Sequence, residues 1–178
     1  MTLVLDARTA RQFGWRGAWL VLTVTLLAGA LPIAWRALQV SEARAMQATR
    51  DNLALGLVAR AAEEVVAGHA LDRQWLAADP FRQLRWQPDD YCGELADGER
   101  PRRGCWHYLP QRGWVLYRSR FQSGAWTNAI HGYALRRVPA KAVEGLRDRD
   151  GVVSLELEPV PAGQLAKWMS AIEEQARR

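Results

Sequence analysis

Histidine and cysteine are scarce in this chain, which holds three histidines and two cysteines in 178 residues. Metal centres need clusters of such residues, and the spacing of the two cysteines matches no familiar zinc pattern. The sequence also lacks the G-x-S-x-G turn of serine hydrolases, a glycine-rich phosphate loop and a dinucleotide-binding fingerprint. We therefore expect no metal, no cofactor, no small-molecule substrate and no catalytic centre.

Lysine is almost absent, because Lys141 and Lys167 are the only lysines and arginine carries the formal net charge of +5. An excess of arginine is one feature of nucleic-acid-binding proteins, which concentrate it on one face or segment. Here the arginines are scattered along the sequence. We therefore expect no nucleic-acid partner.

Acidic residues are missing between Asp6 and Glu42, and no charged residue of either sign occurs in residues 17–35 (GAWLVLTVTLLAGALPIAW). At roughly 1.5 Å per residue, this segment makes a helix of about 28 Å, close to the thickness of the hydrocarbon layer of a bilayer. Pro32 is expected to bend the helix near its far end. The segment therefore predicts a transmembrane helix. Aromatic and cationic residues that favour the membrane interface lie near its two ends: Trp15, Arg16, Trp19, Trp35 and Arg36.

Two alternatives to a retained membrane anchor are a buried core helix and a cleaved signal peptide. A core helix is disfavoured because the segment is long, uncharged on every face and bracketed by arginines. In a signal peptide, three arginines in residues 8–16 would form the basic region, and residues 28–30 (AGA) would form the cleavage site. Apolar residues continue beyond that site to Trp35, which favours the anchor.

The orientation of the anchor follows from the lengths of its two flanks. A short N-terminal tail before a long domain usually stays in the cytoplasm, because long domains are translocated largely regardless of charge. We therefore expect residues 1–16 in the cytoplasm and residues 17–35 as a single span of the bacterial inner membrane. Residues 70–178 are then a periplasmic domain.

Residues 36–69 contain no proline and are rich in Ala, Leu, Glu, Gln and Arg, which all favour helix. Apolar side chains recur among them at helical spacing, so that they share one face. The segment predicts an amphipathic extension of the membrane helix that ends near Gly68 and packs against other helices. Its helix-packing stripe consists of Leu38, Met46, Leu53, Leu57, Ala61 and Val65.

The periplasmic domain is predicted to be α+β. Residues 70–103 carry turn signals such as Asp79-Pro80 and Asp97-Gly98, and they predict an irregular loop. Strand-type runs, the first two joined by a four-residue turn and the last alternating apolar with polar residues, then predict a small antiparallel sheet, followed by an amphipathic helix at residues 163–177. The predicted strands are residues 105–109, 114–121, 131–138 and 152–160. The long N-terminal helix is expected to pack on this sheet.

The two cysteines, Cys92 and Cys105, both fall in the predicted periplasmic domain. A bridge between them would close a loop of about 14 residues and stabilise the fold by roughly 3 kcal/mol in the chain-entropy model. The rival interpretation is a metal site formed with His107, for which the ligands are too few, and free thiols are the third. We predict the disulfide, which an oxidising compartment favours.

Three tryptophans lie in or beside the predicted strands: Trp106, Trp114 and Trp126. Exposed rings would stack on a sugar or a peptide, whereas buried rings would fill the core of a small sheet. The second role is commoner because each aromatic ring buries much area. We predict core packing, and the alternative function is an envelope ligand-binding or sensor module that uses surface tryptophans.

The order of these parts resembles that of type IV pilins and pseudopilins, with a membrane helix that contains a proline, an amphipathic continuation, a loop and a sheet. The stretches DPFRQLRWQPDDYCGEL and GCWHYLPQRGWVLYRSRF are similar to a run in minor pilin-like proteins, especially those of mannose-sensitive haemagglutinin (MSHA) pilus biogenesis. The resemblance covers residues 15–138. The matching positions are Asp79, Pro80, Leu84, Pro88, Tyr91, Gly93, Glu94, Gly104, Trp106, Tyr108, Leu116, Tyr117 and Arg118.

This resemblance implies a pilin-like fold and a non-enzymatic, membrane-anchored accessory subunit of a type IV pilus or type II secretion assembly. Its partners would be the inner membrane and other pilin-like or assembly proteins. Prepilins carry a cleavage-site glycine, then a methylated phenylalanine, and a glutamate at the fifth mature position. Here Gly14 is followed by Trp15, and the fifth position is Trp19. The resemblance therefore implies an uncleaved accessory subunit rather than an ordinary filament subunit.

Overall fold

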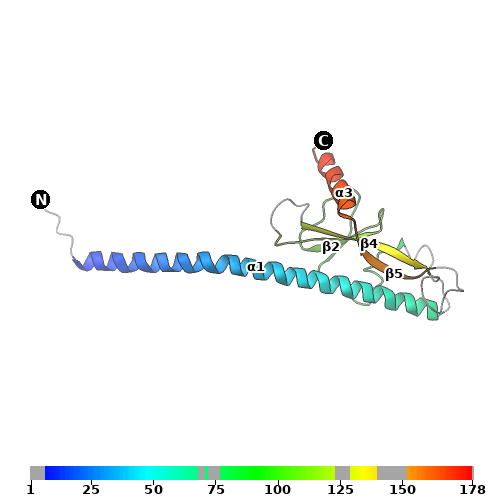
Figure 1. Ribbon diagram of the computed structural model, residues 1–178, viewed down its shortest axis with the longest axis horizontal. Coiled ribbons are helices and arrows are strands. Elements are labelled where there is room, and N and C mark those ends of the chain that lie inside the picture. The colour runs from blue at the N-terminus through cyan, green and yellow to red at the C-terminus, as the bar shows by residue number, and fades with distance from the viewer. Residues whose placement is uncertain (1–6, 68–70, 72–76, 123–128, 140–151, 178) are drawn as a thin grey trace. The chain divides into compact units, whose positions relative to one another are not determined.

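The computed structural model describes residues 7–67, 71, 77–122, 129–139 and 152–177, including their side chains except those of residues 7–14, 16, 17, 152 and 153. The chain divides into two compact parts, residues 1–41 and residues 42–178. Figure 1 shows the order of the elements, from α1 in blue and cyan, through the strands, to α3 in red.

Helix α1 runs without interruption from Ala7 to Val66. The predicted transmembrane helix and its amphipathic extension are therefore one element, which begins before residue 17 and continues through Pro32. Good helix formers on both sides of the apolar segment account for this continuity. The predicted stop, Gly68, lies outside the described residues.

The apolar side chains of residues 18–35 are exposed along α1. Within the described ranges this is the one stretch that is long and apolar enough to cross a membrane, by length and composition. The hydroxyl of Thr25 donates a hydrogen bond to the carbonyl of Val21 at 2.8 Å. Such bonds satisfy a hydroxyl within its own helix, which an apolar surrounding requires. The N-terminal part of α1 is thus a candidate membrane helix.

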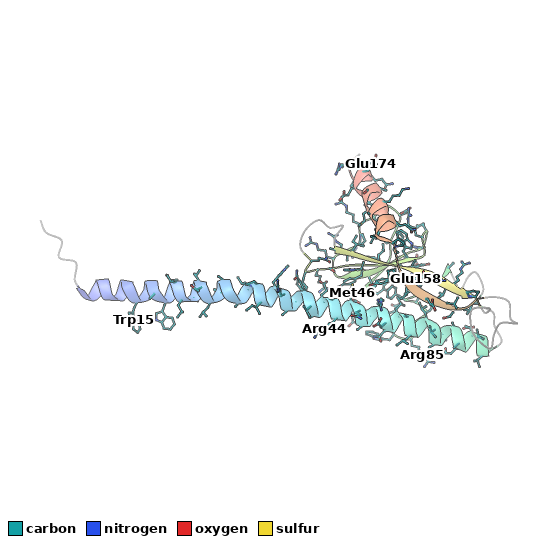
Figure 2. All side chains as sticks on the ribbon, in the orientation of Figure 1. Trp15, Arg44, Met46, Arg85, Glu158 and Glu174 are labelled. Carbon is teal, nitrogen blue, oxygen red and sulfur yellow. A yellow bond between two sulfur atoms is a disulfide. The ribbon has the colours of Figure 1, made fainter. Side chains whose placement is uncertain are left out.

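The predicted interface residues flank this stretch. The rings of Trp15, Trp19 and Trp35 are exposed, and Arg36 is exposed as well. Figure 2 labels Trp15 near the beginning of α1. The side chain of Arg16 lies outside the described residues. An exposed ring at these positions has the amphipathic character that the boundary between lipid and water favours.

A five-stranded sheet follows α1, in the order β1-β2-β3-β4-β5. The strands are β1 (Tyr91–Glu94), β2 (Cys105–Leu109), β3 (Trp114–Arg118), β4 (Ile130–Pro139) and β5 (Val152–Pro159). Strands β2 to β5 overlap the four predicted strands, although β3 ends three residues early, and they pair antiparallel with one another. Strand β1 pairs parallel with β2. The sheet is therefore mixed, and the prediction of a purely antiparallel sheet is wrong.

Strand β1 falls in the segment that was expected to be an irregular loop. It has only four residues, it follows a turn at residues 88–90, and Gly93 within it has a φ of 96°. A strand so short carries no alternating run that a sequence pattern reveals. Its pairing depends on residues remote in sequence, such as Trp106, whose N–H donates to the carbonyl of Asp90 at 2.8 Å.

The sheet separates two hydrophobic clusters, and the alternation of side chains along β3 shows how. Val115 and Tyr117 join the cluster on the side of α1, whereas Trp114 and Leu116 join the cluster on the side of α3 (Ala162–Gln175). Helix α3 lies close to the predicted range. It buries the four residues on which its prediction rested, Leu165, Trp168, Met169 and Ile172.

The predicted helix-packing stripe divides between the two parts of the chain. Leu53, Leu57 and Ala61 are buried in the cluster on the side of α1, and Met46, labelled in Figure 2, packs half-buried against it. Val65 is also half-buried, and Leu38, in the N-terminal part, is exposed. From residue 46 to residue 61 the stripe therefore packs on the chain's own sheet.

Candidate functional site

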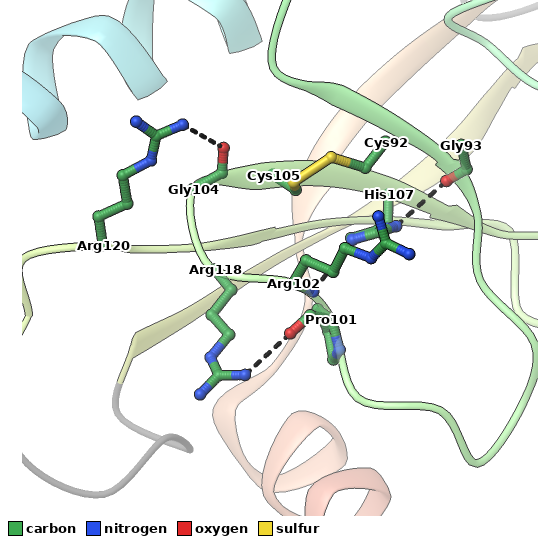
Figure 3. Close-up of a disulfide and its surroundings, with 9 residues drawn as sticks. All are labelled: Cys92, Gly93, Pro101, Arg102, Gly104, Cys105, His107, Arg118 and Arg120. Carbon is green, nitrogen blue, oxygen red and sulfur yellow. Dashed lines mark hydrogen bonds between the residues drawn. A yellow bond between two sulfur atoms is a disulfide. The ribbon is translucent and has the colours of Figure 1, made fainter.

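A disulfide bonds Cys92 of β1 to Cys105 of β2, with an S–S distance of 2.05 Å. It joins the two strands of the parallel pair across the loop that connects them (Figure 3). The His107 ring lies close by, with a ring nitrogen within 4.8 Å of both sulfur atoms. Because both sulfur atoms share one bond, this group of three offers no thiolate to a metal ion.

His107 is buried and serves as a hydrogen-bonding support for the loop. Its Nε2 accepts the backbone N–H of Arg102 at 3.1 Å, so that its Nδ1 carries the proton and lies 3.3 Å from the carbonyl oxygen of Gly93. Burial lowers the pKa of His107, and the positive charge of Arg102 acts in the same direction. The ring is therefore neutral at pH 7, with both nitrogens engaged.

Arginines that are scattered in the sequence gather around this loop. Arg118 donates from Nη1 to the carbonyl of Pro101 at 2.9 Å, and Arg120 donates from Nη2 to that of Gly104 at 3.4 Å (Figure 3). Burial lowers the pKa of Arg118, and the nearby positive charges of the loop act in the same direction. The arginine cluster consists of Arg100, Arg102, Arg103, Arg118 and Arg120.

Gly104, at the end of the loop, has a φ of 68°, a conformation that L side chains rarely adopt. A Cβ at this position would also overlap the side chain of Arg120. Its N–H donates to the carbonyl of Arg118 at 2.6 Å. The glycine thus lets Arg120, which lies just beyond the end of β3, pack closely against the disulfide loop.

The carboxylate of Glu42, on α1, holds the chain where β3 ends. It accepts the hydroxyl of Tyr117 at 2.9 Å and the N–H of Phe121 at 3.1 Å, and it also accepts the N–H of Arg120. The N–H groups of Arg120 and Phe121 donate to this carboxylate and not to a neighbouring strand. This explains why β3 ends at Arg118, whereas the predicted strand ends at residue 121.

Sequence reasoning missed the role of Glu42, although a signal was present. Glu42 is the only acidic residue between Asp6 and Asp51. A half-buried carboxylate needs hydrogen-bond donors, and those donors come from the far end of a strand remote in sequence. Burial raises the pKa of Tyr117, and its hydrogen bond to Glu42 raises it further.

A second buried carboxylate, Asp79, organises the loop before β1. It accepts the N–H of Phe81 at 3.0 Å and the hydroxyl of Tyr91, and Arg82 Nε lies 3.4 Å from its Oδ2. The rings of Phe81 and Tyr91 stack with their centroids 4.3 Å apart. Asp79 and Tyr91, two of the positions that match the pilin-like run, are therefore direct contacts in this fold.

The tryptophans near the strands fill the core. Trp106 and Trp114 are buried on opposite sides of the sheet, and Trp126 lies outside the described residues. A groove of about 360 Å³ runs past Trp114, and its remaining lining residues are Arg112, Gln164, Lys167, Trp168 and Ala171. The two rings in its wall are less than a tenth exposed, so neither offers a face on which a sugar ring would stack.

The face of α1 that points away from the sheet carries a row of uncharged side chains. Its exposed positions recur at alternating steps of three and four residues, the spacing of a coiled-coil seam. The outward stripe consists of Ala45, Ala48, Asn52, Leu55, Ala59, Ala62 and Val66, all exposed. Charged side chains such as Arg44 and Glu63 flank it. The helix-packing stripe predicted from the sequence, with Leu53 and Leu57, lies on the opposite face of α1. Spacing alone did not separate the two stripes, because the residues of both recur at helical intervals.

Comparisons with protein-family models, with curated proteins and with solved structures find no match to this chain. The resemblance of two sequence stretches to pilin-like proteins therefore stays a prediction from the sequence. Most of those residues have structural roles in the domain, since Trp106, Tyr108, Leu116 and Tyr117 are buried in the sheet. The chain contains both a candidate membrane helix and a disulfide-closed domain.

Proposed function

We propose that this chain is a non-enzymatic, membrane-anchored, pilin-like accessory subunit of a type IV pilus or type II secretion assembly. Residues 17–35 anchor it in the inner membrane, and residues 70–178 lie in the periplasm, where the disulfide is stable. The observation that carries the proposal is the outward stripe of α1. It is a long, uncharged and exposed helix face on the side opposite the sheet.

The outward stripe has the composition of a helix-packing surface. Ala48, Ala59 and Ala62 have small side chains that let another backbone approach, and Leu55 supplies a large apolar side chain between them. In the sequence, the same spacing continues upstream through the apolar segment. Those upstream positions are Leu20, Val24, Leu27, Leu31, Ala34, Leu38 and Ser41, all exposed.

The opposite face of α1 supports this assignment by elimination. Leu53, Leu57 and Ala61 are buried against the sheet, so they belong to the domain's own core. A partner helix that packs along residues 45–66 therefore cannot use these buried side chains, whereas the outward stripe is exposed to meet it. Packing of α1 against partner helices in the same membrane would place the domain at the periplasmic surface of the assembly.

The proposal is tested by substituting the outward stripe in the full chain. Leu55→Arg places a charge in its middle, and Gln47→Arg places the same charge at an exposed position off the stripe. Each tagged variant is purified from bacterial membranes in mild detergent, and associated proteins are identified by mass spectrometry. We expect pilus or secretion-assembly subunits with the unaltered chain and with Gln47→Arg, and a loss of at least tenfold with Leu55→Arg. Absence of such subunits, or equal recovery with both variants, contradicts the proposal.

A further inference from the structure

The arginine cluster gathers five positive charges around the disulfide loop. Arg100, Arg102, Arg103 and Arg120 are exposed, and Arg118 is half-buried. Figure 3 shows Arg102, Arg118 and Arg120 gathered around the disulfide from the loop and from the end of β3. Like charges so close repel one another, so the arrangement is favourable where an anionic surface compensates it.

Among the described residues, the carboxylates of Glu42, Glu99 and Asp90 lie near the cluster and are partly engaged by other groups. Glu42 accepts the hydroxyl of Tyr117 and two backbone N–H groups. Glu99 accepts the N–H of Ala96 at 3.4 Å, and Asp90 is half-buried with its pKa raised by burial. Within the described ranges, no ion pair involves the side chain of Arg102 or that of Arg103. These two side chains therefore present exposed positive charge on the patch.

The patch is also held in a fixed shape. The disulfide closes the loop at its base, His107 binds the loop backbone at Arg102, and Arg118 binds it at Pro101. A loop fixed in this way loses little conformational entropy when its arginines bind a partner. Arginine in particular presents a planar fork that pairs with two oxygens of a phosphate group.

Chain connectivity places the patch close to the end of the apolar segment. Glu42 holds the backbone of Arg120 and follows Arg36 by six positions. Six residues span about 9 Å as a helix and at most about 21 Å when fully extended, whatever the relative orientation of the two parts. Lipid headgroups at the end of a membrane-embedded segment 17–35 therefore lie within reach of the patch.

We propose that the arginine cluster binds the anionic phospholipid headgroups of the membrane that holds residues 17–35. This inference rests on the membrane anchor of the proposed function. Each arginine near an anionic surface increases the bound population by about fivefold. The cluster would fix the domain against the lipid surface, so that the outward stripe of α1 meets partner helices in a constant orientation.

The test uses the full chain in nanodiscs of phosphatidylcholine alone or with about a third of phosphatidylglycerol. Hydrogen exchange of the backbone amides of residues 95–104 is followed by mass spectrometry. We expect exchange to be several-fold slower in the anionic discs, and the difference to disappear at high salt. Arg102→Gln with Arg103→Gln should remove most of the protection. Arg137→Gln with Lys167→Gln, which removes two exposed charges elsewhere, should leave it.

The outcomes separate this inference from the proposed function. A chain that does not enter the discs contradicts the anchor and both proposals with it. A chain that enters them but exchanges equally in both lipids overturns the lipid-binding inference alone. Slower exchange on addition of inorganic phosphate to phosphatidylcholine discs would identify a site for free phosphate, and this also overturns the inference.

Discussion

The carboxylate of Glu42, on α1, accepts the hydroxyl hydrogen of Tyr117, in β3, at 2.9 Å. The two residues are 75 positions apart in the sequence, and the same carboxylate also receives the N–H groups of Arg120 and Phe121. One acidic side chain therefore fastens the helix to the strand end that carries two members of the arginine cluster. This junction is a direct target for substitution.

Replacing Glu42 by Ala should lower the free energy of unfolding of the domain by about 1–3 kcal/mol, because it leaves several donors without an acceptor. Tyr117→Phe removes a single bond and should cost about 1 kcal/mol. The measurement is urea denaturation in detergent, followed by tryptophan fluorescence. Arg44→Ala, on an exposed part of α1, is the control and should leave the midpoint unchanged. A Glu42→Ala midpoint equal to that of the control would contradict this role.

The stability of the domain should decrease at mildly acidic pH. Burial lowers the pKa of His107 from its ordinary value of 6.5, so the folded chain binds fewer protons than the unfolded chain just below that pH. Stability is thus complete above about pH 6.5 and falls below it, by up to about 1.4 kcal/mol per pH unit for one histidine. Burial also lowers the pKa of His131, which adds a second contribution.

Denaturation between pH 7.5 and pH 5.5 measures this dependence. Each single variant, His107→Gln or His131→Gln, should keep part of the slope, and the double variant should be nearly flat. If the double variant loses stability as steeply as the unaltered chain, other groups are responsible.

The elements with regular periodicity were predictable from the sequence. Strands β2 to β4 are runs rich in aromatic and apolar residues, and β5 alternates apolar with polar residues, while α3 buries the same four residues that its helical spacing indicated. Strand β1 was not predictable, since four residues around Gly93 gain strand geometry only by pairing with β2. Periodicity is a local signal, and this pairing is not local.

The candidate site was less predictable for a related reason. The arginines Arg102 and Arg118 are distant in sequence, and they come together only because the disulfide loop and the end of β3 fold together. Likewise, Leu53 and Leu55 both lie on stripes with helical spacing. The sequence alone does not state which of the two stripes the sheet covers, because that depends on how the sheet docks.

Removing the disulfide should lower the free energy of unfolding by about 3 kcal/mol, in the chain-entropy model of a short closed loop. Denaturation with and without reductant measures this effect. The double variant Cys92→Ser with Cys105→Ser should match the reduced chain and respond no further to reductant. Alkylation of the native chain without reductant should label neither cysteine. Complete labelling, with unchanged stability on reduction, would contradict the bond.

Two leucines on α1 provide a matched test of which helix face belongs to the core. Leu57 is 0% exposed and Leu55 is 69% exposed, although they are only two positions apart. Leu57→Asp loses the buried side chain and forces a carboxylate into an apolar cluster, which should cost at least about 3 kcal/mol. Leu55→Asp exposes its carboxylate to water and should change stability by less than about 0.5 kcal/mol.

Tryptophan fluorescence and limited proteolysis of the full chain distinguish the two variants, because Trp106 and Trp114 are buried only in the folded domain. We expect Leu57→Asp to unfold the domain and Leu55→Asp to keep it folded. A folded Leu57→Asp variant would mean that α1 does not dock on the sheet through this face. Since Leu57→Asp disrupts folding itself, loss of partners in that variant says nothing about assembly. Loss of partners in a folded Leu55→Asp variant identifies the outward stripe as the surface that binds them.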